Sequence, residues 1–113
     1  MGRLLALKQV EVDSVATVLG NIKKHDRVTI LDESNQELGV IVALHDVLDG
    51  NKIAVVDIPS GGNIVKTGYE IGIAQRDILA GDLVHVHNVR SSRLDIPDNI
   101  IQSIIIQMGI EVN

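Results

Sequence analysis

The chain has 113 residues, a formal net charge of −5, no cysteine and one aromatic residue, a tyrosine. This length suits one domain, and a hydrophobic content of 45% is typical of a globular chain. The negative charge and the scarcity of rings for base stacking argue against a nucleic-acid partner. No apolar run approaches a membrane span and no signal peptide is recognisable, so we expect a cytoplasmic protein without a membrane partner. The lack of cysteine excludes disulfides, thiolate metal ligands and cysteine nucleophiles.

The first part of the chain predicts a strand followed by a short helix. Residues 4–12 alternate imperfectly between apolar and polar side chains, as in a half-buried strand. Asp13 is a good helix N-cap, because its carboxylate can accept an orphan backbone N–H. Apolar residues then recur at helical spacing as far as Ile22. We therefore expect a helix over residues 14–23.

After residue 24 the pattern changes to short β-branched runs separated by turns that contain glycine, aspartate or asparagine. Glycine supplies positive φ in such turns, and Asp and Asn bond to their own backbone. Many short strands at close intervals indicate a mostly β domain with one or two short helices. The expected strands cover residues 28–30, 38–44, 53–56, 64–65, 71–74 and 83–89.

Two segments of this β region resemble each other. Residues 57–61 and 77–81 share the pattern Asp-Ile-x-x-Gly, 20 residues apart, and an apolar pair follows each. Each segment predicts a strand end, a turn and the start of the next strand. The pattern fits either recurrent turn chemistry or a duplicated unit.

The composition changes again after Ser92, so we divide the chain into a domain over residues 1–92 and an extension over 93–113. Asp95 can cap a helix and Pro97 suits a first helical turn. Isoleucines then recur at i, i+4 spacing, which predicts a helix over residues 97–108. The many β-branched residues leave a strand as the competing interpretation. The apolar stripe is either core or a docking surface for a partner chain.

The segment GDLVHVHNVRS, residues 81–91, holds two of the four histidines. On a strand, His85 and His87 would share one face, about 7 Å apart at Cα. Neutral imidazole is a common metal ligand, and its protonated form binds anions. The pair is a reasonable half-site but not a complete metal site, because two ligands are too few. Two surface or partly buried histidines remain the plain alternative.

Other candidates are weaker. His25 lies in a polar turn, where we expect it to be solvated, and His45 lies at a strand end from which it could approach the same site. Lys52 and Lys66 lie in apolar strands, where a lysine either extends outward or faces an anion. The chain carries no Ser-His-Asp pattern, P-loop or dinucleotide-binding fingerprint.

Three ordered motifs resemble a known family: GNKIAVVDI, then IVKTGYEIGIA, then DILAGDLVHVHNV, with DSVATVL upstream. Together they resemble the small N-terminal domain of the altronate and galactarate dehydratase family, a module also found as the small subunit of sulfolactate sulfo-lyases. The likeness covers residues 10–90. It implies a SAF-type domain with a β-clip fold, within a metal-dependent lyase that removes water or sulfite from a hydroxylated acid.

The resemblance also implies a set of site residues. His85, His87 and Asn88 match the family's His-x-His-Asn, Lys66 matches the lysine before a glycine, and Lys52 matches the lysine of Gly-His-Lys. His85 and His87 are then the expected catalytic residues and the expected ligands of a divalent ion, Fe²⁺ or Mn²⁺. The remaining three, with Asn51, are the expected substrate-binding residues.

Two positions depart from the family pattern: Asn51 stands where the family usually has His, and Thr67 stands where it usually has Tyr, with Tyr69 close by. Such departures imply either a different acid or a loss of activity.

A chain this short resembles the small subunit of a two-chain enzyme. The resemblance implies a large dehydratase-like subunit that holds most of the metal site, and an acid substrate such as altronate or galactarate. Assembly into a homo-oligomer is a further expectation. The alternative is a non-catalytic SAF-type binding or assembly module, or a stand-alone sensor of sugar acids.

Overall fold

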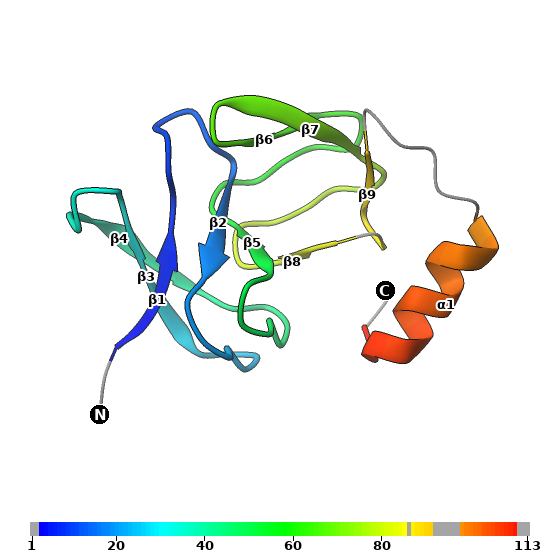
Figure 1. The fold of residues 1–113 in the computed structure, drawn as a ribbon, viewed down its shortest axis with the longest axis horizontal. Helices are drawn as coiled ribbons and strands as arrows, with labels where there is room; N and C mark the ends of the chain where they lie inside the picture. The colour runs from blue at the N-terminus through cyan, green and yellow to red at the C-terminus, as the bar shows by residue number, and fades with distance from the viewer. Residues whose placement is uncertain (1–2, 86, 92–97, 111–113) are drawn as a thin grey trace.

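The computed structural model describes residues 3–85, 87–91 and 98–110, which form nine strands and one helix (Figure 1). The mostly β fold of a small SAF-type domain is confirmed. The elements are β1 (Leu4–Leu7), β2 (Val15–Val18), β3 (Arg27–Leu31), β4 (Glu37–Val42), β5 (Lys52–Ala54), β6 (Asn63–Lys66), β7 (Tyr69–Ala74), β8 (Leu83–Val84), β9 (Val89–Ser91) and α1 (Asp98–Met108).

The strands form two sheets. The larger sheet has the order β4-β3-β1-β2-β5-β8, and the smaller has the order β6-β7-β9. Only the β1–β3 pair is parallel; the other pairs are antiparallel. The chain therefore returns repeatedly to the middle of the larger sheet, which brings residues far apart in sequence together.

The larger sheet contributes its two faces to two separate cores. Ala16, Ile53 and Leu83 lie opposite one another across β2, β5 and β8, so their side chains share one face, and all three belong to the first core. Val15 and Ala54 lie on the other face and belong to the second core, together with Ile64 and Ala74 of the smaller sheet. The half of the larger sheet around β5 is thus packed on both faces.

One turn pattern occurs four times, twice as often as the sequence analysis found. It begins at residues 21, 46, 57 and 77 with Asp or Asn, followed by a buried Ile or Val. Four residues after each start, the backbone has positive φ: His25 (79°), Gly50 (85°), Gly61 (82°) and Gly81 (100°). Three residues after each of these positive-φ positions, a buried Val or Ile lies within a strand. His25 in place of a glycine hides the first copy from a search for Asp-Ile-x-x-Gly.

The four turns form two reciprocal pairs. Ile22 pairs with Val47, and Ile58 pairs with Ile78, each through two backbone hydrogen bonds. In each pair, the first residue of one turn accepts a hydrogen bond from the backbone of the other. The repeated segments at residues 57–61 and 77–81 are therefore the two halves of one paired unit.

The predicted helix over residues 14–23 is wrong, because this segment contains β2. Asp13 does not cap a helix; its buried carboxylate accepts hydrogen bonds from the backbone N–H groups of Val10 (3.1 Å), Thr67 (2.9 Å) and Gly68 (2.8 Å). Pairing of β2 with β1 and β5 outweighs the helical spacing of its apolar residues.

Two predicted strands are shorter than expected. The strand over residues 4–12 ends at Leu7, since residues 10–13 form a turn closed on Asp13. The strand over residues 83–89 is divided into β8 and β9 by a turn at His85–Asn88. His85 and His87 therefore do not lie on one strand.

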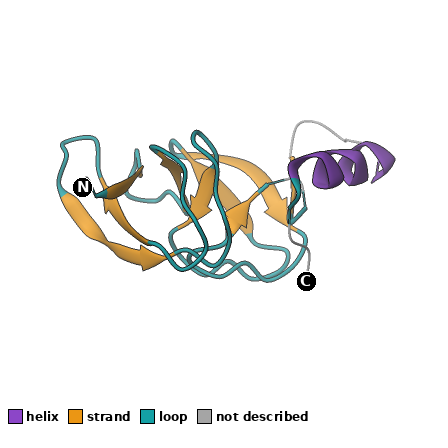
Figure 2. Cartoon of the chain, turned by 90° about the horizontal axis from the view of Figure 1, so that it is seen from below, coloured by secondary structure: helices purple, strands orange, loops and turns teal. Residues whose placement is uncertain are grey.

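The predicted C-terminal helix is confirmed as α1, at one end of the elongated molecule (Figures 1 and 2). Ile101 is buried, and Ile110, which follows the helix, packs against the first core. Ile106 remains 77% exposed. Within the described residues, no helix is long and apolar enough to cross a membrane. The predicted helix start at residue 97, with Asp95, lies outside the described residues.

Candidate acid-binding site

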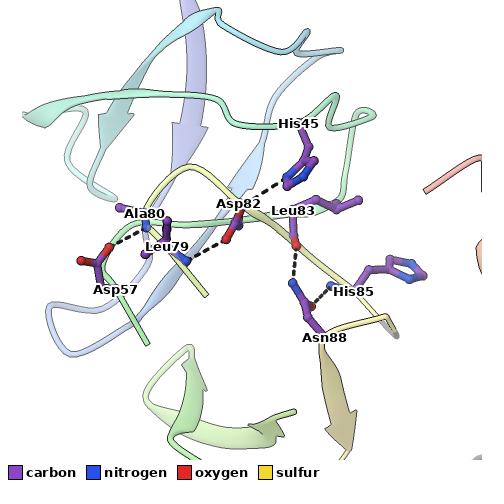
Figure 3. Close-up of polar contacts among 8 residues, drawn as sticks. All are labelled: His45, Asp57, Leu79, Ala80, Asp82, Leu83, His85 and Asn88. Carbon is purple, nitrogen blue, oxygen red and sulfur yellow. Dashed lines mark hydrogen bonds and ion pairs between the residues drawn. The ribbon is translucent and has the colours of Figure 1, made fainter. Parts of the chain in front are cut away.

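Asn88 builds the turn that carries the two central histidines (Figure 3). Its Oδ1 accepts a hydrogen bond from the backbone N–H of His85 (3.0 Å), and its Nδ2 donates to the carbonyl of Leu83 (2.8 Å). Its backbone N–H also donates to the carbonyl of His85 (3.1 Å). Asn88 is 3% exposed, and both ends of its amide are engaged in the turn. These contacts hold the backbone of His85 and Leu83 against Asn88.

Both imidazoles carry a buried nitrogen. Nδ1 of His85 and Nδ1 of His87 have no hydrogen-bond partner within the part of the chain that the structure describes. Buried polar atoms in native proteins are normally satisfied, so an unsatisfied pair on one turn indicates a missing ligand or partner. In Figure 3 the ring of His85 points away from Asn88.

Cations surround this turn on two sides. Burial and then the positive charge of Lys52 lower the pKa of His85. Burial lowers the pKa of His87 to about 4, with further contributions from Arg76, His45 and His85. Both imidazoles are therefore neutral at pH 7. His85 faces the Lys52 side of the turn and His87 the Arg76 side.

The two predicted lysines lie close enough to repel each other. Lys52 begins β5 and Lys66 ends β6, and both side chains are half-buried. Burial and then the charge of Lys66 lower the pKa of Lys52. Lys52 is thus near enough to both Lys66 and His85 for their charges to interact, and His85 is near enough to His87. A concentration of positive charge in a half-buried place favours an anionic ligand.

Asn51 lines a separate cavity of about 480 Å³, whose lining includes none of Lys52, Lys66, His85 and His87. The cavity is also lined by His45 and Lys24, and by Met108 from the end of α1. His45 Nδ1 lies 3.2 Å from Oδ1 of Asp82 (Figure 3), and His45 lines a second cavity together with His87. His25, in contrast, lies exposed in its turn, as predicted.

A neighbouring cavity of about 490 Å³ contains residues that the sequence analysis missed. It shares Lys24 and His45 with the first cavity and adds Arg76, Asp82 and His87. Arg76 and Asp82 flank the fourth copy of the repeated turn. No sequence pattern identifies them, because they approach His45 through the tertiary fold.

The described residues do not form a metal site by themselves. No three His, Asp or Glu side chains among them come together as a metal-binding group. Lys52 and Arg76 also add positive charge beside the imidazoles, and like charges repel a divalent ion. These residues fit an anion better than a metal held by this chain alone.

Thr67, one of the two departures from the family pattern, lies in the tight turn between β6 and β7. Its φ is 53°, and Gly68 after it has a φ of 80°. Asp13 accepts both backbone N–H groups, so the turn is fixed from outside the hairpin. Tyr69 is exposed at the start of β7.

Comparison with known proteins agrees with the motifs. The family model for the altronate/galactarate dehydratase SAF domain matches residues 5–92. Altronate dehydratase of Escherichia coli (strain K12) is 34% identical over 85 residues, which is 75% of this chain and 16% of that protein. Altronate dehydratase of Bacillus subtilis (strain 168) is 36% identical over 84 residues, which is 74% of this chain and 16% of that protein. The chain therefore spans 16% of the length of these curated relatives, and it belongs to the altronate/galactarate dehydratase SAF domain family.

Proposed function

We propose that this chain acts as the small subunit of a sugar-acid dehydratase, and that a larger chain completes its site. The curated relatives are altronate dehydratases about six times as long as the matched region, which supports a need for further protein. The acid would be a small hydroxylated carboxylate such as altronate or galactarate. The cytoplasm is the expected location.

The observation that carries the proposal is the pair of unsatisfied imidazole nitrogens beside two lysines. Lys52 and Lys66 repel each other, and this repulsion contributes to the lowered pKa of Lys52. A bound carboxylate would replace this repulsion with two attractions, and it would stabilise the charged form of Lys52. The lysines therefore supply affinity for the acid group of the substrate.

The imidazoles are suited to proton transfer next to that carboxylate. Dehydration of a hydroxy acid needs a base that removes the proton beside the carboxylate and an acid that assists the departing hydroxyl. We assign the base to one of His85 and His87, whose neutral ring can accept the proton, and the acid to the other, which must take up a proton before it can donate one to the departing hydroxyl. A negative ligand would raise the lowered pKa of both rings, so binding of the acid prepares them to take up a proton.

We assign the divalent ion, Fe²⁺ or Mn²⁺, mainly to the larger chain, because the described residues of this chain lack a third ligand. We assign Asn51 a contact with a hydroxyl of the substrate, which is supported by its place in one cavity with His45. Asn88 is a positioning residue, since its amide is used within the turn.

The test is co-purification of the tagged chain from its native host, with mass spectrometry of the chains that accompany it. The expected partner is a larger dehydratase-like polypeptide. The purified assembly should convert altronate or galactarate to the 2-keto-3-deoxy acid, while the small chain alone should not. A chain that purifies without such a partner, with no effect on any dehydratase reaction, would contradict the proposal.

A binding or assembly module is the second candidate. The observation that favours it is an exposed apolar face on the larger sheet, described below. Binding of a sugar acid to the isolated chain, with no catalytic partner in the host, would favour this second function.

A further inference from the structure

The half of the larger sheet around β4 exposes an apolar face. Leu5, Thr29 and Val40 lie opposite one another on β1, β3 and β4, so their side chains share a face. Leu7 and Val42 lie on this face by the same register. The backbone N–H of Leu19 donates to the carbonyl of Leu5, so Leu19 extends the face just past the end of β2. We call Leu5, Leu7, Leu19, Val40 and Val42 the outer face.

This face is not part of either core. Residues of the opposite face, Ala6, Val28 and Ile30, belong to the first core, whereas no outer-face residue belongs to a described core cluster. Val40 is 43% exposed, and Val42 and Leu19 are exposed to a similar degree. An antiparallel sheet with one face in water normally carries polar residues there. A contiguous apolar face therefore indicates an interaction surface.

Neither the smaller sheet nor α1 covers this face, although Thr29 and Leu31 in its middle are buried and Arg3 pairs with Glu37 at its edge. The smaller sheet packs against the β2–β5–β8 half of the larger sheet, through Val15, Ala54 and Val84. The helix α1 stands at the opposite end of the molecule from β3 and β4 (Figure 1). Leu19, Val40 and Val42 therefore stay exposed next to the described elements of the chain.

Two charges on the same face define how a second copy would fit. Arg27 lies opposite Val42 at one end of β3, and Glu37 lies opposite Leu31 at the other end. These two charged positions, at the two ends of β3, are about 13 Å apart along the strand, from the rise per residue. Consider a two-fold axis that lies in the plane of the interface, at right angles to the strands, near Thr29. It would place Arg27 of each copy over Glu37 of the other. An axis parallel to the strands would instead oppose like charges.

We propose that the outer face forms a symmetric dimer with a second copy of this chain. The apolar rows of the two sheets would pack face to face, as in a β-sandwich, and two Arg27–Glu37 pairs would frame them. Glu37 also lies 3.5 Å from Arg3 of its own chain, so in the dimer its carboxylate would be shared between Arg3 and Arg27 of the other copy. This inference does not depend on the proposed catalytic function.

The test is the molar mass of the full chain in solution, from light scattering or sedimentation over a wide concentration range. The wild-type chain should have the mass of a dimer. Val40→Glu should raise the dissociation constant by about tenfold or more, because a central apolar contact becomes a buried charge. Ile73→Glu is the matched control, since Ile73 is 41% exposed on the smaller sheet and should leave the dimer intact.

A charge exchange tests the orientation without disturbing the apolar surface. Arg27→Glu alone and Glu37→Arg alone should each weaken the dimer, and the double variant should regain the wild-type dissociation constant. Circular dichroism of each variant would show that the fold is kept. A wild-type chain that is monomeric at every concentration, or a dimer unaffected by Val40→Glu, would overturn the proposal; monomers would leave the larger dehydratase chain as the occupant.

Discussion

Asp57 and Asp77 exchange equivalent hydrogen bonds across the centre of a paired turn. Oδ1 of Asp57 accepts from the backbone N–H of Ala80, and Oδ1 of Asp77 accepts from the backbone N–H of Ser60, both at 2.9 Å. Figure 3 shows the first of these contacts beside the site. Through Asp82 and Leu83, the same turn leads directly into β8 and the histidine turn. The reciprocal pair therefore positions the segment that leads into the histidine turn.

Removal of one carboxylate from the pair should destabilise the fold. Asp57→Ala leaves the N–H of Ala80 without its partner, which should lower the free energy of unfolding by about 1–2 kcal/mol. Asp57→Asn keeps an accepting oxygen and should lower the free energy of unfolding much less. In the other pair of turns, Oδ1 of Asn21 already accepts the equivalent hydrogen bond from the backbone N–H of Asp49. Urea unfolding measures both. Equal losses for the two variants would show that the hydrogen bond is not the cause.

The equivalent glycines of two turns should respond differently to alanine. A Cβ on Gly81 would lie 2.2 Å from the carbonyl oxygen of Val42, whereas a Cβ on Gly61 would meet no atom within 4 Å. Both have positive φ, so Gly61→Ala should cost only the backbone strain, about 1 kcal/mol. Gly81→Ala should cost about 3 kcal/mol or more, because β4 must move. Thermal unfolding of the two variants measures the difference; equal melting temperatures would contradict it.

Thr67 is strained in its present turn and should be improved by asparagine. A β-branched residue is unfavourable at a φ of 53°, whereas asparagine tolerates this region. Asn35, with a φ of 64°, already shows this preference in the same chain. Thr67→Asn should raise the free energy of unfolding by about 0.5–1 kcal/mol. Thr67→Val, which keeps the branch, is the control and should give no increase; a gain from Thr67→Val equal to that from Thr67→Asn would refute the strain argument.

Stability should fall in mild acid because of His87. Its folded pKa of about 4 lies below the value of 6.5 for a free histidine, so the unfolded chain binds more protons between these values. The contribution of the neutral His87 ring to the free energy of unfolding is therefore complete above pH 6.5, and it is lost as the pH falls toward 4. His87→Gln should reduce the change in unfolding free energy between pH 7.5 and pH 5 by about 1–3 kcal/mol. An unchanged pH dependence in the variant would show that His87 is not buried in neutral form.

The sequence predicted most strands, whereas its site residues stay predictions. The strand at β4 and the helix α1 follow from periodicity and turn residues, which are local signals. The predicted helix at residues 14–23 failed because β2 is defined by its partners on β1 and β5, which are distant in sequence. The continuous strand over residues 83–89 failed for the opposite reason, since Asn88 closes a local turn through its side chain.

The components of the site that were missed depend on the paired turns. Asp82 and Arg76 lie near His45 and His87 because the second and fourth turns meet, and no spacing in the sequence shows this contact. Glycine at the fifth position identifies only three of the four turns, because His25 adopts the same φ in the first. A search for the alternation of Asp or Asn, a buried aliphatic and a positive-φ residue would have found all four.

The most direct measurement is the dehydratase activity of the assembled enzyme carrying His85→Ala. We expect kcat to fall by a factor of about 100 or more, since a proton-transferring group is removed. His25→Asn is the matched control, because it removes an exposed imidazole at a position where asparagine tolerates the positive φ, and it should keep full activity. An assembled His85→Ala enzyme as active as the control would contradict the account of an acid-binding site built on the His85–Asn88 turn.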